Sequence, residues 1–130
     1  MGKTAAETSE GTADDTTPQA RCLPFGEIQH YDIRFLKPLD ENILHEVGKT
    51  FDTVITVEDG VRNGGMGSAV LEWMNDHGYN PTVVRLGLPD EFVEQGTVAQ
   101  LRKLCGIDTE SIKDTIVRAL AGDLPQSFNR

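Results

Sequence analysis

The stretch from Asp52 to Asp90 decides the fold, and it reads DTVITVEDGVRNGGMGSAVLEWMNDHGYNPTVVRLGLPD. Two β-branched runs, at 53–57 and 82–86, flank a glycine-rich turn and an amphipathic run that ends near His77. A strand, a helix and a second strand in this order predict two parallel strands joined by a right-handed crossover. We therefore expect an α/β fold.

The glycine-rich turn from Gly60 to Gly67 is the first candidate for a ligand site. Backbone N–H groups and the positive end of a helix dipole converge at such a turn and can hold a phosphate. However, Val70 stands where a dinucleotide fingerprint needs its third small residue, and no Lys-Ser or Lys-Thr pair follows as in a P-loop. The residues favour a simpler interpretation, in which the glycines permit a sharp turn and close helix packing.

Charged side chains near the same edge are the second candidate. Glu58 and Asp59 end the first strand at its carboxyl edge, where ligands of open α/β sheets bind. They could act as acid/base residues or ligands, but capping of the glycine loop is the interpretation we favour. Arg34 and Lys37 could contact a phosphate, but salt bridges to Asp32, Asp40 or Glu58 are the interpretation we favour.

Other catalytic signatures have no support in the sequence. His30, His45 and His77 lack the spacing of a metal site, and no GxSxG motif is present. Cys22 and Cys105 are too far apart to indicate a zinc site or a disulfide framework. Cys105 is also expected in the last turn of a helix, where the dipole opposes thiolate formation.

The composition narrows the class of protein and its partners. A chain of 130 residues suits one domain with a real core. Its net charge is −9 without a basic cluster, which argues against nucleic-acid and anionic-membrane partners. No apolar run approaches about 18 residues and no export signal is recognisable, so we expect a cytoplasmic protein.

The flanks set the expected domain bounds. Residues 1–22 are acidic and poor in hydrophobic side chains, so we expect a disordered tail there. We expect the folded domain over residues 23–121 and a frayed C-terminus over residues 122–130. Alternation over Ile28–Leu36 predicts a strand that ends before Pro38. Asp40 is expected to cap a helix that stops at Gly48.

The C-terminal part predicts a loop and two further helices. The loop at 91–96 is expected to turn Phe92 inward. Thr97 should cap a helix that ends at Gly106, and Asp108 or Thr109 should cap the last one.

Four segments carry a resemblance to a known family. They are YDIRFLKPLD at 31–40, TVITVEDG at 53–60, GGMGSAVLE at 64–72 and LGLPDEFVEQG at 86–96. Their order and spacing resemble the C-terminal domain of 1-deoxy-D-xylulose-5-phosphate synthases, which belong to the transketolase superfamily. The likeness runs from about residue 29 to residue 120 and implies a three-layer α/β/α sandwich with a mostly parallel sheet.

The resemblance also implies a function. Such synthases condense pyruvate with glyceraldehyde 3-phosphate, release carbon dioxide and supply isoprenoid, thiamin and pyridoxal synthesis. Thiamin diphosphate and magnesium are held by two preceding domains, so the resemblance implies a chain that binds neither alone. We expect a non-catalytic fragment or subunit with a structural or dimerisation role. A subunit of a split thiamin-dependent synthase and an independent phosphate-binding module are the alternatives.

The resemblance adds candidate residues but no catalytic role. The matched motif positions are Arg34, Lys37, Asp40, Glu58, Gly64, Gly65 and Gly67, and all of them except Asp40 are candidate ligand-binding residues. The sequence departs from the family at its front, where the strand-helix unit that usually comes first is not recognisable. The gap in the sheet could close by direct pairing of 31–35 with 53–57, by recruitment of Leu23–Phe25, or by self-association.

Overall fold

The computed structural model describes residues 21–22 and 28–124, in two compact units that divide between Asp40 and Glu41. Most of the predicted acidic tail and of the predicted frayed C-terminus lies outside these residues. None of the helices in the described ranges is both long and apolar enough to cross a lipid bilayer.

The first unit contains two short antiparallel strands. Strand β1, Arg21–Cys22, pairs with strand β2, Gln29–His30. The strand predicted over Ile28–Leu36 is therefore wrong beyond His30, and residues 31–35 have no regular secondary structure. An alternating sequence places its side chains on two opposite faces only where the segment pairs with another strand. Because 31–35 forms no strand, the alternation does not bury Phe35, which is 71% exposed. Pairing of 31–35 with 53–57 stays a prediction, because the two segments belong to different units, and Leu23–Phe25 lies outside the described residues.

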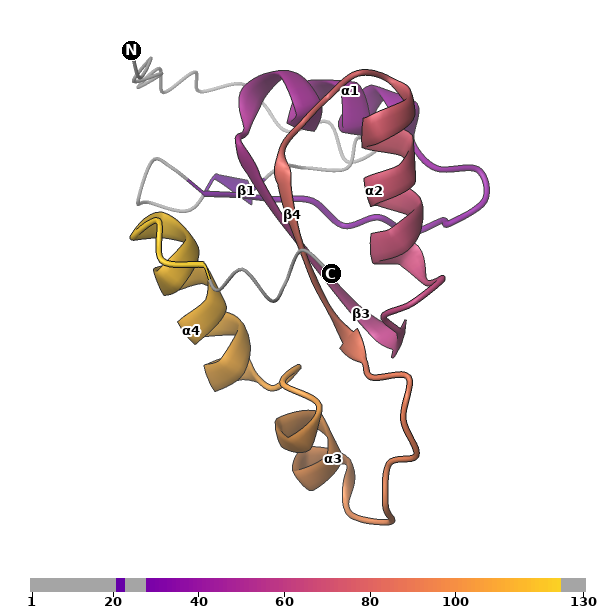
Figure 1. The fold of residues 1–130 in the computed structure, drawn as a ribbon, viewed down its shortest axis with the longest axis vertical. Coiled ribbons are helices and arrows are strands. Elements are labelled where there is room, and N and C mark those ends of the chain that lie inside the picture. Colours follow the sequence, from indigo (N-terminus) through magenta and orange to yellow (C-terminus); the bar gives the residue numbers. More distant parts are fainter. Residues whose placement is uncertain (1–20, 23–27, 125–130) are drawn as a thin grey trace. The chain divides into compact units, whose positions relative to one another are not determined.

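The second unit has six elements. They are α1 (Glu41–Thr50), β3 (Thr53–Val61), α2 (Met66–Asp76), β4 (Thr82–Leu88), α3 (Val98–Leu104) and α4 (Thr109–Leu120). Strands β3 and β4 are parallel, with Thr53 opposite Thr82 and Val57 opposite Leu86. Figure 1 shows the two strands between α2 on one side and α4 on the other. The predicted strand-helix-strand unit and the α/β class are confirmed.

The α2 side of the sheet holds a closely packed core. Leu44, Val70 and Met74 are each at most 2% exposed, and Val83 of β4 is 4% exposed. The predicted end of α1 at Gly48 is wrong, because the helix continues to Thr50. Gly48 instead lies against the ring of Tyr79, where a Cβ atom would be 2.6 Å from Cγ. This glycine thus serves packing rather than helix termination.

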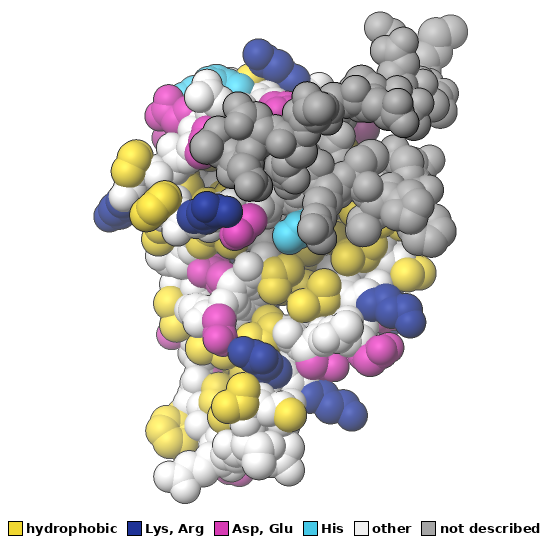
Figure 2. Space-filling view, turned by 180° about the vertical axis from the view of Figure 1, so that it is seen from behind, with side chains coloured by type: hydrophobic (Ala, Val, Ile, Leu, Met, Phe, Trp, Pro, Cys, Tyr) yellow, Lys and Arg dark blue, Asp and Glu magenta, His cyan; other side chains and the backbone are white. Residues whose placement is uncertain are grey.

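The α4 side of the sheet has a smaller core. Val84 and Leu86 of β4 pack with Ile107, and Ile112 lies partly buried against them. Thr97 caps α3 in a capping box with Gln100, as predicted, but α3 has no buried residue. Leu104 is 72% exposed. Figure 2 shows hydrophobic side chains scattered among charged ones on one face of the molecule.

The loop before α3 also differs from the prediction. Phe92 is 94% exposed rather than turned inward. Hydrophobicity alone does not bury a loop residue, because the surrounding elements must offer an apolar surface that receives it.

Candidate functional site

The glycine loop before α2 is filled by a carboxylate of the chain itself. Glu58 Oε2 accepts a hydrogen bond from the backbone N–H of Met66 at 2.7 Å, and Oε1 accepts one from Gly67 at 3.0 Å. These are the donors that a phosphate would use at a helix N-terminus. The predicted capping role is therefore confirmed for Glu58.

The glycines of the loop make room for this carboxylate. A Cβ atom at Gly65 would lie 2.2 Å from both Glu58 Oε2 and the carbonyl oxygen of Val61. At Gly67 it would lie 2.5 Å from Thr56 Oγ1, so this glycine lets α2 approach β3. Close packing, which we favoured from the sequence, is therefore confirmed at both positions.

The remaining loop glycine meets a conformational demand. Gly64 has φ of +82°, a backbone region that side chains other than glycine rarely adopt. Its N–H donates to Ser68 Oγ at 3.0 Å. The loop thus engages the N–H groups of Gly64, Met66 and Gly67 internally.

The predicted basic pair lies in the first unit. Arg34 Nε is 3.7 Å from Asp32 Oδ2, and both side chains are more than 70% exposed. Such an ion pair contributes about 0–1 kcal/mol to stability. Lys37 is exposed as well. Asp59, the other carboxylate of the predicted edge pair, lies 3.7 Å from Arg102 Nη2 in the second unit. Ligand binding by Arg34 and Lys37 stays a prediction.

Two arginines that the sequence analysis did not single out lie beside the loop. Arg85 Nη1 donates to Ser68 Oγ at 2.7 Å and to the carbonyl oxygen of Arg62 at 3.2 Å. The Nε atom of Arg62 is buried and has no hydrogen-bond partner among the described residues. One sequence signal could have identified Arg85, namely a charged residue inside the β-branched run at 82–86.

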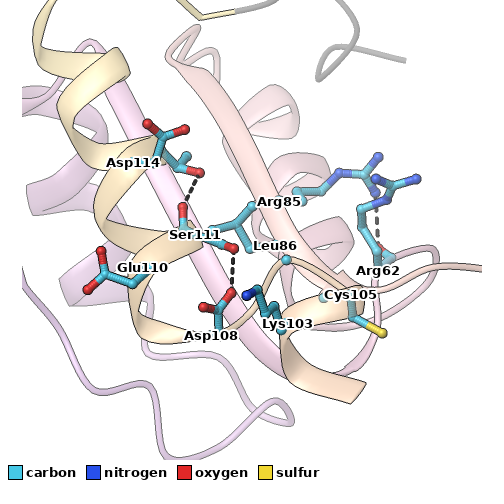
Figure 3. Close-up of a pocket in the computed structure, with 12 residues that line it drawn as sticks. Arg62, Arg85, Leu86, Lys103, Cys105, Asp108, Glu110, Ser111 and Asp114 are labelled. Carbon is cyan, nitrogen blue, oxygen red and sulfur yellow. Dashed lines mark hydrogen bonds between the residues drawn. The ribbon is translucent and has the colours of Figure 1, made fainter. Parts of the chain in front are cut away.

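These arginines border a cleft of about 430 Å³ on the α4 side (Figure 3). The two guanidinium groups lie together on the other side of β4 from the acidic side chains of α4, and that of Arg85 is bonded to Ser68 of α2. The lining residues come from the turn after β3, from β4, from the end of α3 and the turn that follows it, and from the first turns of α4. They include Arg62, Arg85, Leu86, Lys103, Cys105, Asp108, Glu110, Ser111 and Asp114.

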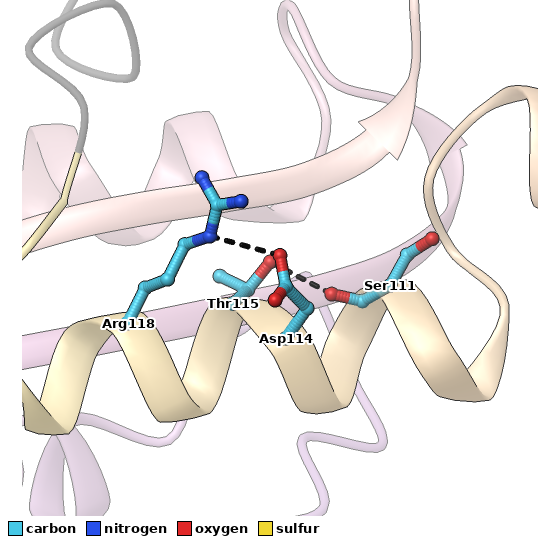
Figure 4. A network of polar contacts seen from close by, with 4 residues as sticks. All are labelled: Ser111, Asp114, Thr115 and Arg118. Atoms are coloured by element: carbon cyan, nitrogen blue, oxygen red, sulfur yellow. Dashed lines mark hydrogen bonds and ion pairs between the residues drawn. The ribbon is translucent and has the colours of Figure 1, made fainter.

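The carboxylates of the cleft are engaged along their own helix. Asp108 accepts a hydrogen bond from Ser111 Oγ, and this bond lowers the pKa of Asp108 below its ordinary value. Asp114 Oδ2 is 2.9 Å from Arg118 Nε, in a contact that Figure 4 shows on the surface of α4. Glu110 Oε2 is 3.9 Å from Lys113 Nζ.

Within residues 21–22 and 28–124, no three His, Cys, Asp or Glu side chains converge as metal ligands would. We assign no reaction step through thiamin diphosphate or its metal ion to these residues.

Comparison with known proteins places this fold and loop in a family. The model of the transketolase C-terminal domain matches residues 27–112, which is more than half of the chain. The chain belongs to the family of transketolase C-terminal domains. Within this family, its sequence is similar to the C-terminal region of 1-deoxy-D-xylulose-5-phosphate synthases.

Three relatives show the extent of the similarity. The synthase of Bacteroides thetaiotaomicron is 60% identical over 91 residues, 70% of this chain and 14% of the relative. That of Bacteroides fragilis is 49% identical over 118 residues, 91% of this chain and 17% of the relative. That of Cytophaga hutchinsonii is 56% identical over 93 residues, 72% of this chain and 14% of the relative. The chain thus spans less than a fifth of the length of these relatives.

Proposed function

We propose that this domain is a structural module of a 1-deoxy-D-xylulose-5-phosphate synthase and has no synthase activity by itself. The observation that carries the proposal is the 60% identity over 91 residues to a protein of that name. The glycine loop supports a structural role, because Glu58 occupies the N-terminus of α2. In this proposal the condensation of pyruvate with glyceraldehyde 3-phosphate takes place on thiamin diphosphate held by other domains.

The exposed edges and side chains of the β3–β4 sheet favour association of this module with a partner. In the part of the chain that the structure describes, β3 and β4 have no third strand beside them. Val57 of β3 is 42% exposed, and Val117 of α4 is 56% exposed. Unpaired strand edges and exposed apolar side chains favour association. We propose that the module docks on the domains that bind thiamin diphosphate.

A complementation experiment tests this function. The thiamin diphosphate domains of the Bacteroides thetaiotaomicron synthase would be produced without their matching C-terminal region and assayed with and without this chain. We expect no product from the chain alone, weak or no activity from the truncated synthase, and recovery on mixing. Product formation by the chain alone would contradict the proposal, and so would a mixture that neither co-elutes nor gains activity.

The same purified chain distinguishes docking from self-association. Light scattering coupled to size exclusion should give the mass of one chain in the absence of the truncated synthase, and a larger complex in its presence. A stable dimer of the chain alone would instead support self-association, the alternative that the sequence leaves open. A chain that co-elutes with the truncated synthase and restores its activity would also function as the separate subunit of a split enzyme.

A further inference from the structure

We propose that the loop at 91–96 and helix α3 form the docking surface of this module, with Phe92 as its anchor. The partner surface is an apolar pocket with a basic rim, on the part of the synthase that holds thiamin diphosphate. The inference rests on the proposed function and adds to it which face of the module docks and by what chemistry.

The surface is apolar and uncovered among the described residues. Phe92 is 94% exposed, Leu104 72% and Val98 63%. Val98, Leu101 and Leu104 recur every three residues, so they lie along one side of α3. A helix with such a stripe ordinarily buries it, yet α3 has no buried residue. The helix therefore carries the pattern of an interface.

The loop and the helix lie at one end of the second unit. Figure 1 shows both beyond the end of β4. At the lower end of the view in Figure 2, hydrophobic side chains lie beside charged ones. An apolar centre with a polar rim is the usual composition of a docking surface.

Phe92 has the properties of an anchor. An aromatic ring contributes a large apolar area to an interface, and such residues dominate binding energies. The loop has no helix or strand of its own, but β4 ends at Leu88 before it and the capping box of Thr97 begins α3 after it. The fold thus fixes both ends of the segment that presents the ring.

The charges beside the anchor indicate the chemistry of the partner. Asp90, Glu91 and Glu94 are exposed, and none of them forms an ion pair among the described residues. These carboxylates surround Phe92 in the sequence of a chain whose net charge is −9. Complementary potentials favour association, so the rim of the pocket that receives Phe92 should carry Lys or Arg side chains.

The same charges argue against a second copy as the occupant. A two-fold dimer places the same patch of both subunits face to face, which would bring the two acidic loops together. The relatives offer another occupant, because the matched region is 14% of the Bacteroides thetaiotaomicron synthase and 17% of the Bacteroides fragilis synthase. In these relatives, a much longer chain accompanies the module and can supply the complementary surface.

Binding of variants to the truncated synthase of the complementation experiment tests the surface. The truncated synthase is first shown to bind thiamin diphosphate, which establishes that it is folded. Phe92→Ser should weaken binding of the full chain by about thirtyfold, and Leu104→Ser by about tenfold. Both side chains are mostly exposed, so both variants should fold normally. The matched controls Val117→Ser and Leu120→Ser remove exposed apolar side chains from α4 and should change affinity by less than about twofold.

The rate of association tests the basic rim. It should fall as salt increases from about 0.01 M to about 0.15 M, because the Debye length shrinks from about 30 Å to about 8 Å. Replacement of two rim charges in Glu91→Gln/Glu94→Gln should slow association at low salt and reduce this dependence. Glu72→Gln removes an exposed carboxylate from α2 and should leave the rate nearly unchanged.

Hydrogen exchange separates the possible occupants. Amides at 91–96 should exchange fast in the free chain, and amides at 91–104 should be protected in the complex. Slow exchange at 91–96 in the free chain would show that another part of this chain covers the loop, and would overturn the inference. A dimer of the free chain that Phe92→Ser dissociates would overturn it in favour of a second copy.

The inference and the proposed function fail in different ways. Binding that Phe92→Ser leaves unchanged, or that Val117→Ser weakens more, would refute this docking surface and leave the proposed docking intact. Absence of binding by the unaltered chain to a truncated synthase that holds thiamin diphosphate would refute the proposed docking itself.

Discussion

The α2 side and the α4 side of the β3–β4 sheet bury their side chains in different ways. On the α2 side, two helices and the sheet enclose Leu44, Val70 and Met74 almost completely. On the α4 side, Val84 and Leu86 are covered mainly by Ile107 and by partly buried neighbours, and charged residues line the adjacent cleft. The difference predicts that residues on the α2 side contribute more to the stability of the fold than residues on the α4 side.

Truncation of one core residue on each side tests this comparison most strongly. Met74→Ala should lower the free energy of unfolding by about 3 kcal/mol, because Met74 is 1% exposed and leaves a cavity. Ile107→Ala should cost about 2 kcal/mol, since Ile107 lies in a smaller core from which neighbours can relax. Urea unfolding measures both. The control Leu104→Ala should cost less than about 0.5 kcal/mol. A larger loss for Ile107→Ala than for Met74→Ala would reverse the comparison.

Crowding at the start of α2 gives the next largest effect. Gly65→Ala should destabilise the fold by about 2 kcal/mol, because the added Cβ would meet Glu58 and the backbone of Val61 at 2.2 Å. Thermal unfolding measures the change. In Gly96→Ala the nearest atom would be 3.4 Å away, at the end of the flexible Leu101 side chain, so this control should be close to neutral. Equal stability of the two variants would show that Glu58 is not held at the loop.

The cap of α3 should have a smaller and more local effect. Thr97→Ala removes the side-chain acceptor for the backbone N–H of Gln100 and should cost about 1 kcal/mol. Because α3 has no buried residue, hydrogen exchange should accelerate within 98–104 while the amides of α2 change little. Faster exchange throughout α2 would mean that the two sides of the sheet unfold as one unit.

The smallest effect concerns the titration of Asp108. Its hydrogen bond with Ser111 lowers its pKa below 3.8, so Ser111→Ala should raise the pKa toward that value. A carboxylate with a depressed folded-state pKa stabilises the fold above its unfolded pKa, and this contribution is lost as pH falls through the folded value. Carboxyl chemical shifts measured between about pH 2 and pH 5 give the midpoint.

A neighbouring variant provides the control for this titration. Thr109→Ala removes a hydroxyl from the same turn that does not bond to Asp108, so the midpoint should remain at the wild-type value. An unchanged midpoint in Ser111→Ala would show that Ser111 does not hold the carboxylate of Asp108 in solution.

Local sequence patterns were sufficient to predict the helices and strands whose capping and periodicity signals lie within a few residues of each other. The β-branched runs at 53–57 and 82–86, the helix between them and the cap at Thr97 all formed as predicted. Hydrophobic periodicity and capping chemistry act over one or two turns, so they can be recognised in the sequence. The same holds for the interpretation of Gly65 and Gly67 as packing glycines.

Tertiary structure decided which side chains lie together. Met66 follows Glu58 by eight positions, and only the fold of the turn between β3 and α2 brings that carboxylate to the helix N-terminus. Likewise, Arg62, Ser68 and Arg85 lie apart in the sequence and are joined by hydrogen bonds because the turn after β3, α2 and β4 converge. Residues 31–35 illustrate the opposite case, since an alternating pattern forms no strand without a partner ladder. The sequence by itself determined the β3–α2–β4 unit, the cap of α3 and the family, whereas contacts between distant segments determined which side chains lie together, because charge and burial depend on neighbours in space.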